Sequence, residues 1–262
     1  MSAGAGGGIH PAAFVDPKAR LGERVTIGPG AIVGPDVTIG DGTRIDAHAL
    51  VTGWTTIGRD CHLHHGAVAG SPPQDLKYPG AASYLVIGDR TVMREYTTAN
   101  LATEPGFTTR IGSDCLLMAY CHVAHNCQVG DRVVIANSVQ MAGYVVVDDW
   151  AILGGGTVVH QFTRIGRHSM IGGGSRIPQD IAPFVKAAGS PPRNAGINSI
   201  GLERRGFERE TRQALERAYR IFFRDGLTAR AAVDQIRARF AGIPEVEHFA
   251  RFCETSVRGI SR

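Results

Sequence analysis

An aliphatic residue returns every six positions through most of this chain. The phase holds from Ile9 to Leu63, resumes at Ile87, and runs from Ile111 to Ile177, with glycine often next and a small residue in the fifth position. A period of six excludes amphipathic helices, whose apolar period is 3.6 residues. One hexad cannot bury its own apolar face, so hexads must coil and stack with backbone ladders about 4.8 Å apart. The repeat therefore predicts a mainly β fold, a parallel β-helix of hexapeptide repeats.

Composition supports a folded repeat and argues against several other classes. Glycine contributes 34 of 262 residues, well above the usual share, while 43% hydrophobic content excludes collagen and low-complexity sequence. No apolar run is long enough to span a bilayer, and the Gly-rich start lacks the pattern of a secretory signal. No basic stripe with interleaved aromatics points to nucleic acid. An odd count of five cysteines suits a reducing compartment, so we expect a cytoplasmic protein without stable membrane insertion.

The repeat is interrupted twice and ends before the C-terminal quarter. Loops are predicted at 71–85 and 99–110, and both return in phase. Helical spacing then predicts helices over 207–225, 228–241 and 244–258, with Thr228 as an N-cap and Pro244 in a first turn. The expected organisation is a flexible N-terminus (1–8), a β-helix (9–190) and a C-terminal helical domain (191–262).

Charge and cysteines each allow two interpretations. Residues 201–262 hold 13 Arg and no Lys against 9 acidic residues, so the whole net charge of +4 lies there (13 − 9 = 4). This favours either a solvated helical face or a docking surface for an acidic partner. The four cysteines of the repeat all fall in the small fifth position: Cys61, Cys115, Cys121 and Cys127. That position predicts packed core thiols rather than a metal or redox site.

Histidines depart from the repeat in one region. Three hexads make one coil, so residues 18 apart should stack, which places His125, Gly143 and Gln161 in one column with a notch at the glycine. The polar neighbours of this column are His122, Tyr144 and His160. Histidine is the natural general base near neutral pH. The alternatives are turn histidines satisfied by backbone groups, or a zinc site, which the absence of a placed acid or thiolate disfavours.

Longer segments resemble the UDP-N-acetylglucosamine O-acyltransferase family. They are IHPAAFVDP (9–17), QDLKY (74–78), AYCHVAHNC (119–127), MAGYVVVDDWAILGGGTVVHQF (141–162), IGGGS (171–175), QDIAPFV (179–185) and GINSIGLERRGF (196–207). The resemblance implies a left-handed β-helix that forms a homotrimer with active sites between subunits. It also implies transfer of a β-hydroxyacyl chain from acyl carrier protein to the glucosamine 3-hydroxyl of UDP-N-acetylglucosamine, the first committed step of lipid A synthesis in Gram-negative bacteria. No metal or other cofactor is implied, because the thioester is already activated.

The same resemblance assigns roles to individual residues. His125 matches the general base, and the backbone of Gly143 matches the oxyanion stabiliser. Gly173 matches the position that limits acyl length. The positions that match substrate contacts are Gln74, Asp75, Lys77, His122, Tyr144, His160, Gln161, Asn198, Arg204 and Arg205. Lys77, one of three lysines in the chain, suits a compact point charge, although a chance surface lysine fits equally well.

Four positions depart from the family pattern. Tyr144 stands where a histidine is usual, and Asn126 follows the base where an acid is frequent, which predicts a base without charge support. Asn100 replaces a common histidine and Ile200 a glutamate. Two alternatives therefore stay open: N-acylation of a 3-amino sugar nucleotide, and a non-catalytic relative that binds a nucleotide sugar or carrier protein.

Overall fold

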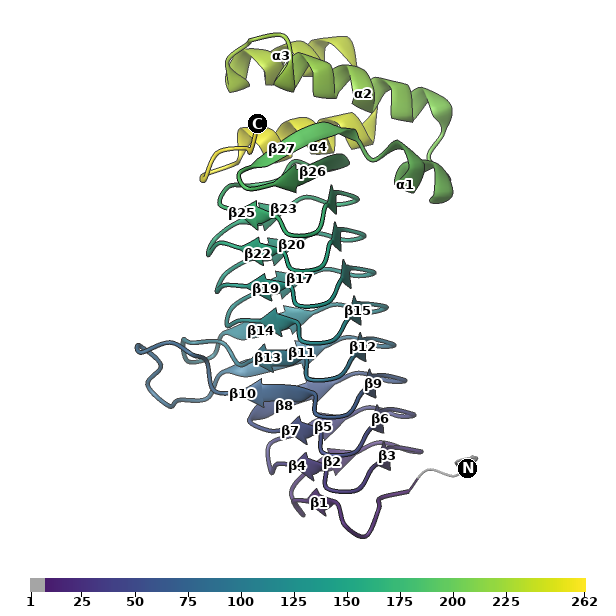
Figure 1. Cartoon of the computed structure of the whole chain (residues 1–262), viewed down its shortest axis with the longest axis vertical. Coiled ribbons are helices and arrows are strands. Elements are labelled where there is room, and N and C mark those ends of the chain that lie inside the picture. The colour runs from purple at the N-terminus through teal and green to yellow at the C-terminus, as the bar shows by residue number, and fades with distance from the viewer. Residues whose placement is uncertain (1–7) are drawn as a thin grey trace.

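The computed structural model describes residues 8–262, so residues 1–7 of the predicted flexible N-terminus lie outside the described part. The chain winds as a left-handed parallel β-helix, a triangular prism with one sheet on each face and a cap of helices at the C-terminal end (Figure 1). The predicted fold class is confirmed.

Short strands rise along the three faces in a fixed rotation, sheet A to sheet B to sheet C. Sheet B contains β1 (Phe14–Val15), β4 (Ile32–Val33), β7 (Leu50–Val51), β10 (Val68–Ser71), β13 (Thr98–Asn100), β16 (His122–Val123), β19 (Gln140–Met141), β22 (Val158–Val159) and β25 (Arg176–Ile177). Sheet C contains β2 (Arg20–Leu21), β5 (Thr38–Ile39), β8 (Trp54–Ile57), β11 (Tyr84–Ile87), β14 (Thr108–Ile111), β17 (Gln128–Val129), β20 (Val146–Val147) and β23 (Arg164–Ile165). Sheet A contains β3 (Thr26–Ile27), β6 (Arg44–Ile45), β9 (His62–Leu63), β12 (Val92–Met93), β15 (Leu116–Leu117), β18 (Val134–Ile135), β21 (Ile152–Leu153), β24 (Met170–Ile171), β26 (Val185–Gly189) and β27 (Pro192–Ile197).

The strand register explains why the hexad works. In the uninterrupted coils each strand pairs with the strand 18 residues later, as His122 pairs with Gln140 and Val123 with Met141. Within each two-residue strand the first side chain faces outward and the second is buried, as Gln128 and Val129 show. The aliphatic residue of each hexad therefore fills the prism, and every coil adds one layer to a continuous core.

Turns at the three edges of the prism repeat one backbone conformation. One residue in most of these turns has positive φ, whether it is glycine, as at Gly30 (68°), or a bulky residue, as at Tyr144 (60°) and Phe162 (65°). A non-glycine residue in this left-handed region costs about 1–2 kcal/mol. The turns are named here by the sheets they join: the AB, BC and CA edges.

The cysteine prediction is confirmed. All five cysteines are free and buried, and those of the repeat point into the core cluster. Burial raises the pKa of Cys127 to about 12, which keeps the thiol protonated and unreactive near neutral pH.

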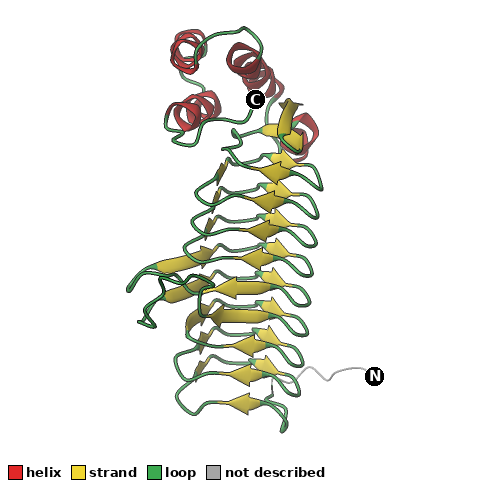
Figure 2. Ribbon diagram, turned by 60° about the vertical axis from the view of Figure 1, so that its left-hand side comes forward, coloured by secondary structure: helices red, strands yellow, loops and turns green. Residues whose placement is uncertain are grey.

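Both predicted loops leave the prism at the BC edge and project to the same side (Figure 2). The first occupies 72–83 between β10 and β11, and the second occupies 101–107 between β13 and β14. They are shorter than the predicted 71–85 and 99–110 because strands β10, β11, β13 and β14 extend into them. Two loops that are distant in sequence thus cover one edge.

The C-terminal region begins differently from the prediction. Residues 192–197, assigned from the sequence to the helical domain, instead form β27, which pairs antiparallel with β26 on sheet A. A hairpin here covers the last rung of the sheet, which would otherwise be an open edge. The helices follow: α1 (Ser199–Arg204), α2 (Arg209–Phe223), α3 (Ala229–Arg239) and α4 (Pro244–Glu254). Thr228 caps α3 by accepting the Ala231 N–H, as predicted. No helix among residues 8–262 is long and apolar enough to cross a membrane.

We predict that Leu117→Ala destabilises the protein by about 2–5 kcal/mol, because the side chain is fully buried in the middle of the stack and its loss leaves a cavity. The matched control is Leu76→Ala, since Leu76 is 106% exposed in the first loop and should leave stability unchanged. Urea unfolding at one protein concentration measures both. Equal midpoints for the two variants would contradict the layered core.

Candidate functional site

His125 lies in the BC turn that follows β16, on the coil next to the second loop. It is only 8% exposed. Its Nδ1 is 3.0 Å from the Asn126 Oδ1, and its Nε2 is 3.8 Å from a carboxylate oxygen of Asp75. One ring nitrogen therefore contacts the neighbouring residue, while the other faces an acid from a loop.

The partners of Asn126 decide which ring nitrogen of His125 carries the proton. The Asn126 Oδ1 accepts the Thr103 N–H at 3.0 Å, and its Nδ2 donates to Glu104 Oε2 at 2.7 Å. The amide is thereby oriented with its oxygen toward His125, so Nδ1 must be the donor. The hydrogen-bond network thus assigns the tautomer in which Nε2 keeps its lone pair, as a general base requires.

Charge support, which the sequence predicted to be absent, is present, and that expectation is wrong. Glu104, from the second loop, accepts hydrogen bonds from both Asn126 and the Tyr144 hydroxyl. These donors, the Tyr144 hydroxyl first, lower the pKa of Glu104, while burial and Glu104 raise the pKa of Tyr144 to about 12. Glu104 is therefore a carboxylate and Tyr144 a neutral phenol at pH 7. The one signal in the sequence was that Glu104 is the only acid in 99–110.

Gly143 stacks on His125, as the 18-residue period predicts: the Tyr144 N–H donates to His125 O, and the Phe162 N–H donates to Gly143 O. The notch expected at the glycine is filled by the imidazole, because a Cβ on Gly143 would lie 2.4 Å from the His125 Cε1. Within residues 8–262 the Gly143 N–H meets no acceptor. At the CA edge the equivalent N–H groups are taken by aspartates of the next coil, as Asp131 accepts from Ser113.

The first loop brings Asp75 to His125. Asp75 accepts the Lys77 N–H through Oδ1 at 2.9 Å, and Thr103 Oγ1 lies 3.5 Å from its Oδ2. The side chains of Gln74 and Lys77 are exposed. Asn100 anchors the base of the loop, since its Nδ2 donates to the carbonyls of Ser71 and Pro72.

The predicted site residues that neighbour the His125 column lie on the BC edge as well. The His122 Nδ1 is 2.7 Å from the Thr98 hydroxyl, and burial lowers the pKa of His122, which keeps it neutral near pH 7. His160 is exposed, with its Nδ1 3.0 Å from the carbonyl of Gln161. His122, Tyr144, His160 and Gln161 thus adjoin the His125 column along the BC edge.

The other predicted site residues lie on different edges of the same chain. Gly173 is exposed in the AB turn after β24. Arg205 lies at the CA edge, with its guanidinium 4.9 Å above the Trp150 ring and 3.2 Å from the His168 Nδ1. Burial, and then Arg205, lower the pKa of His168 to about 4, so its ring is neutral. The single chain does not bring these groups to His125.

Helix α1 carries the three remaining positions. Asn198 is 4% exposed and caps the helix: its Oδ1 accepts the Gly201 N–H and its Nδ2 donates to His168 O. Its side chain thus has a positioning role within the fold. Arg204 is exposed on the helix, and Ile200 is 65% exposed where the family pattern has a glutamate.

His122, His125 and His160 do not converge with other metal ligands in the described residues. In the part of the chain that the structure describes, the one group of three convergent donors is Asp46, His62 and His64, which lies outside the His125 groove. His125 approaches only Asp75 among the acids. Its geometry is that of a proton acceptor beside a carboxylate.

We predict that Gly143→Ala displaces the His125 ring, because the new Cβ would overlap the imidazole, and that its contacts with Asn126 and Asp75 are lost. A crystal structure of the variant measures the displacement. Gly34→Ala is the control, since its Cβ would meet Thr52 at an ordinary 3.4 Å and leave His125 in place. A ring that stays within 3.2 Å of Asn126 in the first variant would contradict the prediction.

Comparisons with known proteins find relatives along the whole chain. Residues 180–261 match a family model described as UDP N-acetylglucosamine O-acyltransferase, domain 2, and residues 18–53, 36–71 and 108–143 match the bacterial transferase hexapeptide model. A curated protein from Herminiimonas arsenicoxydans named acyl-[acyl-carrier-protein]–UDP-N-acetylglucosamine O-acyltransferase is 46% identical over 97% of this chain and 99% of its own length. A protein of the same name from Burkholderia lata is 47% identical, with the same shares covered.

Solved structures give the same result. LpxA from Acinetobacter baumannii superimposes with a TM-score of 0.94 at 41% identity, over 97% of this chain and 99% of its own. LpxA from Bacteroides fragilis, a UDP-N-acetylglucosamine acyltransferase, does so with a TM-score of 0.94 at 39% identity, with the same shares covered. Identity and coverage at these levels show common descent along the whole fold. The chain belongs to the family of acyl-[acyl-carrier-protein]–UDP-N-acetylglucosamine O-acyltransferases.

Proposed function

We propose that this protein transfers a β-hydroxyacyl chain from acyl carrier protein to the glucosamine 3-hydroxyl of UDP-N-acetylglucosamine, in the cytoplasm, as the first committed step of lipid A synthesis. Relatives over the full length bear the name of this reaction's enzyme. The observation that carries the proposal is the His125 network, with Nδ1 held by Asn126 and Nε2 free beside Asp75.

In the proposed reaction, the His125 Nε2 removes the proton of the sugar hydroxyl as its oxygen attacks the thioester carbonyl. The new C–O bond forms, the C–S bond breaks, and the imidazolium returns its proton to the departing thiolate. Asp75 at 3.8 Å and Glu104, acting through Asn126, stabilise the imidazolium that exists between these steps. The unpaired N–H of Gly143 donates to the oxyanion.

The magnitudes fit a reaction that needs no metal. A placed general base contributes about 10²–10⁴-fold, and one oxyanion donor about 10²–10³-fold. The substrate is an activated thioester, so these two contributions act on a low barrier. The intact base network also argues against a non-catalytic binding protein.

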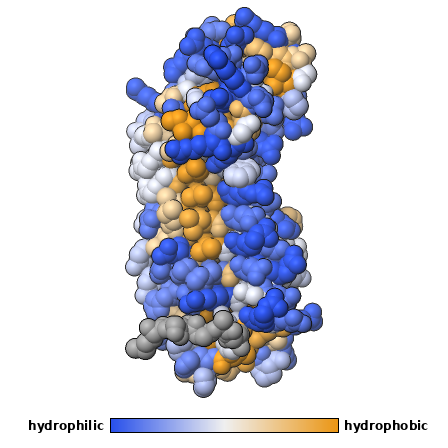
Figure 3. Space-filling model, turned by 90° about the vertical axis from the view of Figure 1, so that its right-hand side faces the viewer, coloured by the Kyte–Doolittle hydropathy of each residue, from blue (hydrophilic) through white to orange (hydrophobic). Residues whose placement is uncertain are grey.

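We propose further that the active protein is a homotrimer with each site between two subunits. Sheet A supports this, because its outward residues form an apolar column that rises toward the helical cap (Figure 3). The column consists of Val92, Leu116, Val134, Ile152 and Met170, all at least partly exposed. Gly173 and Arg205 lie on the two edges that flank sheet A. Packing the BC edge of one subunit against sheet A of the next would bring these residues to His125.

Substrate binding follows from this arrangement. The apolar column is the surface for the acyl chain, and Gly173, which has no side chain, leaves room for a long one. A groove of about 510 Å³ at the CA edge is lined by Arg90, Arg132, Trp150 and Arg205, among others, and suits the nucleotide diphosphate. Arg204 would add a further guanidinium, and Gln74, Asp75, Lys77, His160 and Gln161 would hold the sugar. The Arg-rich helices of the cap would bind the acidic carrier protein.

We predict that His125→Ala lowers turnover by about 10²–10⁴-fold while UDP-N-acetylglucosamine still binds, because only the base is lost. Initial rates with hydroxyacyl carrier proteins measure the loss, and calorimetry measures binding. His65→Ala, on an exposed AB turn, is the control and should retain full activity. Offering the 3-amino sugar nucleotide alongside tests the N-acyl alternative. Preference for the amine would refute the ester assignment, and no turnover on either sugar would favour the binding protein.

Mixed oligomers test the shared site. Co-expression of His125→Ala and Arg204→Ala chains with different tags should give mixed trimers with roughly a third of wild-type turnover, because one site in three combines two intact residues. Each variant alone should be nearly inactive. If the mixed oligomers are no more active than the two parents, the site lies within one chain and the trimeric arrangement is wrong.

A further inference from the structure

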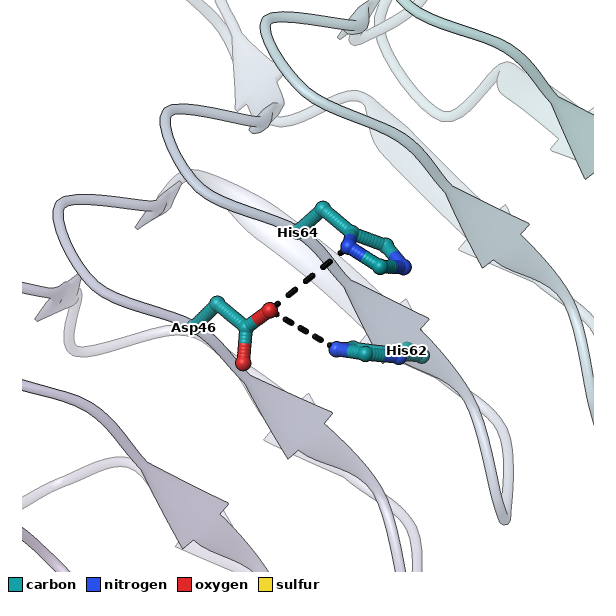
Figure 4. A group of neighbouring side chains, drawn as sticks. All are labelled: Asp46, His62 and His64. Atoms are coloured by element: carbon teal, nitrogen blue, oxygen red, sulfur yellow. Dashed lines mark hydrogen bonds and ion pairs between the residues drawn. The ribbon is translucent and has the colours of Figure 1, made fainter. Parts of the chain in front are cut away.

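A second cluster of ionisable side chains lies low on the β-helix, away from the His125 edge. Asp46 follows β6, His62 lies in β9, and His64 follows β9 in the AB turn (Figure 4). The His62 Nε2 is 2.8 Å from the Asp46 Oδ2, and the His64 Nδ1 is 3.7 Å from the same oxygen. The three donor atoms all lie within 4.8 Å of one another.

Strand geometry explains the convergence. His62 is the outward residue of its strand and pairs with Arg44, two residues before Asp46. Leu63 points into the core, and the chain then turns, so His64 faces outward again with its ring stacked on that of His62 at 3.8 Å. The strand residue His62 and the turn residue His64 therefore present two imidazoles to a carboxylate of the preceding coil.

One oxygen of Asp46 is left to the two imidazoles. Arg44 occupies the other oxygen of Asp46 at 2.6 Å, which leaves Oδ2 alone to face both rings. Glu95, from the next coil and paired with Arg94, brings an Oε1 to 3.5 Å from the His64 Nδ1.

We propose that Asp46, His62 and His64 bind a zinc ion, with a water molecule in the fourth position. Tetrahedral zinc has bonds of about 2.0–2.2 Å to imidazole nitrogen and carboxylate oxygen, which sets its ligand atoms about 3.3–3.5 Å apart. The 2.8 and 3.7 Å separations from the Asp46 Oδ2 lie within about half an ångström of that spacing, and the two ring nitrogens lie within 4.8 Å of each other. Magnesium and calcium prefer all-oxygen sites, so a pair of imidazoles selects against them.

The role of the ion is structural. Its three protein ligands come from two successive coils, those of β6 and β9, so one ion ties two rungs of sheet A together. The site lies just below the apolar column, since His62 pairs with Val92. It does not depend on the proposed acyl transfer, and its presence can be tested without any substrate.

The test uses the full chain, untagged and stripped with a chelator, with zinc chloride as the titrant. Calorimetry should show one site per chain in the micromolar range or tighter, and a hundredfold excess of zinc over the Kd should raise the Tm by about 5–10 °C. His62→Ala and His64→Ala should each weaken binding at least thirtyfold and abolish most of the Tm shift. Magnesium should give neither effect.

His65→Ala is the matched control, because His65 adjoins His64 in the chain but faces Tyr96 instead of Asp46. It should bind zinc as the wild type does. Circular dichroism without zinc confirms that each variant is folded. The proposal is overturned if the stripped wild type takes up no zinc, or if the His62→Ala and His64→Ala double variant binds it as tightly as the wild type. It is also overturned if His65→Ala weakens binding as much as His64→Ala, which would indicate adventitious surface binding only.

Discussion

The backbone ladder between residues 18 apart supports everything else in this molecule. Each strand is only two residues long in most coils, so no strand is stable by itself and all depend on the rungs above and below. The ladder places one residue of most turns in the left-handed region, even where bulky residues such as Tyr120 and Phe162 occupy that position. That strain is tolerated because neighbouring coils fix the turn from both sides.

The His125 site uses this rigidity and adds to it. A regular prism edge alone would present a solvated histidine. Beside the two loops that leave the BC edge, His125 is nearly buried: one loop contributes Asp75, and the other contributes Glu104 through Asn126. On the next coil, Gly143 lacks a side chain and so leaves space for the His125 ring. The β-helix fixes the position of His125, and the two loops place the charged side chains around it.

The three edges have separate chemistries, which a single chain keeps apart. His125 lies on the BC edge, the Arg205–Trp150 stack on the CA edge, and both Gly173 and the Asp46 cluster on the AB edge. Sheet A lies between the CA and AB edges and carries the exposed apolar column (Figure 3). Such a distribution suits a molecule whose functional site is completed by another subunit. The proposed ion site lies apart from it, on the lower AB edge.

The period of six by itself determined the β-helix, the inward position of the cysteines and the stacking of Gly143 on His125, because all three follow from counting residues along a regular coil. Helix spacing and the Thr228 cap likewise followed from local rules. The β26–β27 hairpin did not, since covering the last rung is a demand of the stack. Nor did the links from His125 to Asp75 and Glu104, or the meeting of His62 and His64 with Asp46. Those contacts join different coils through turn and loop conformations, so only the tertiary structure could decide them.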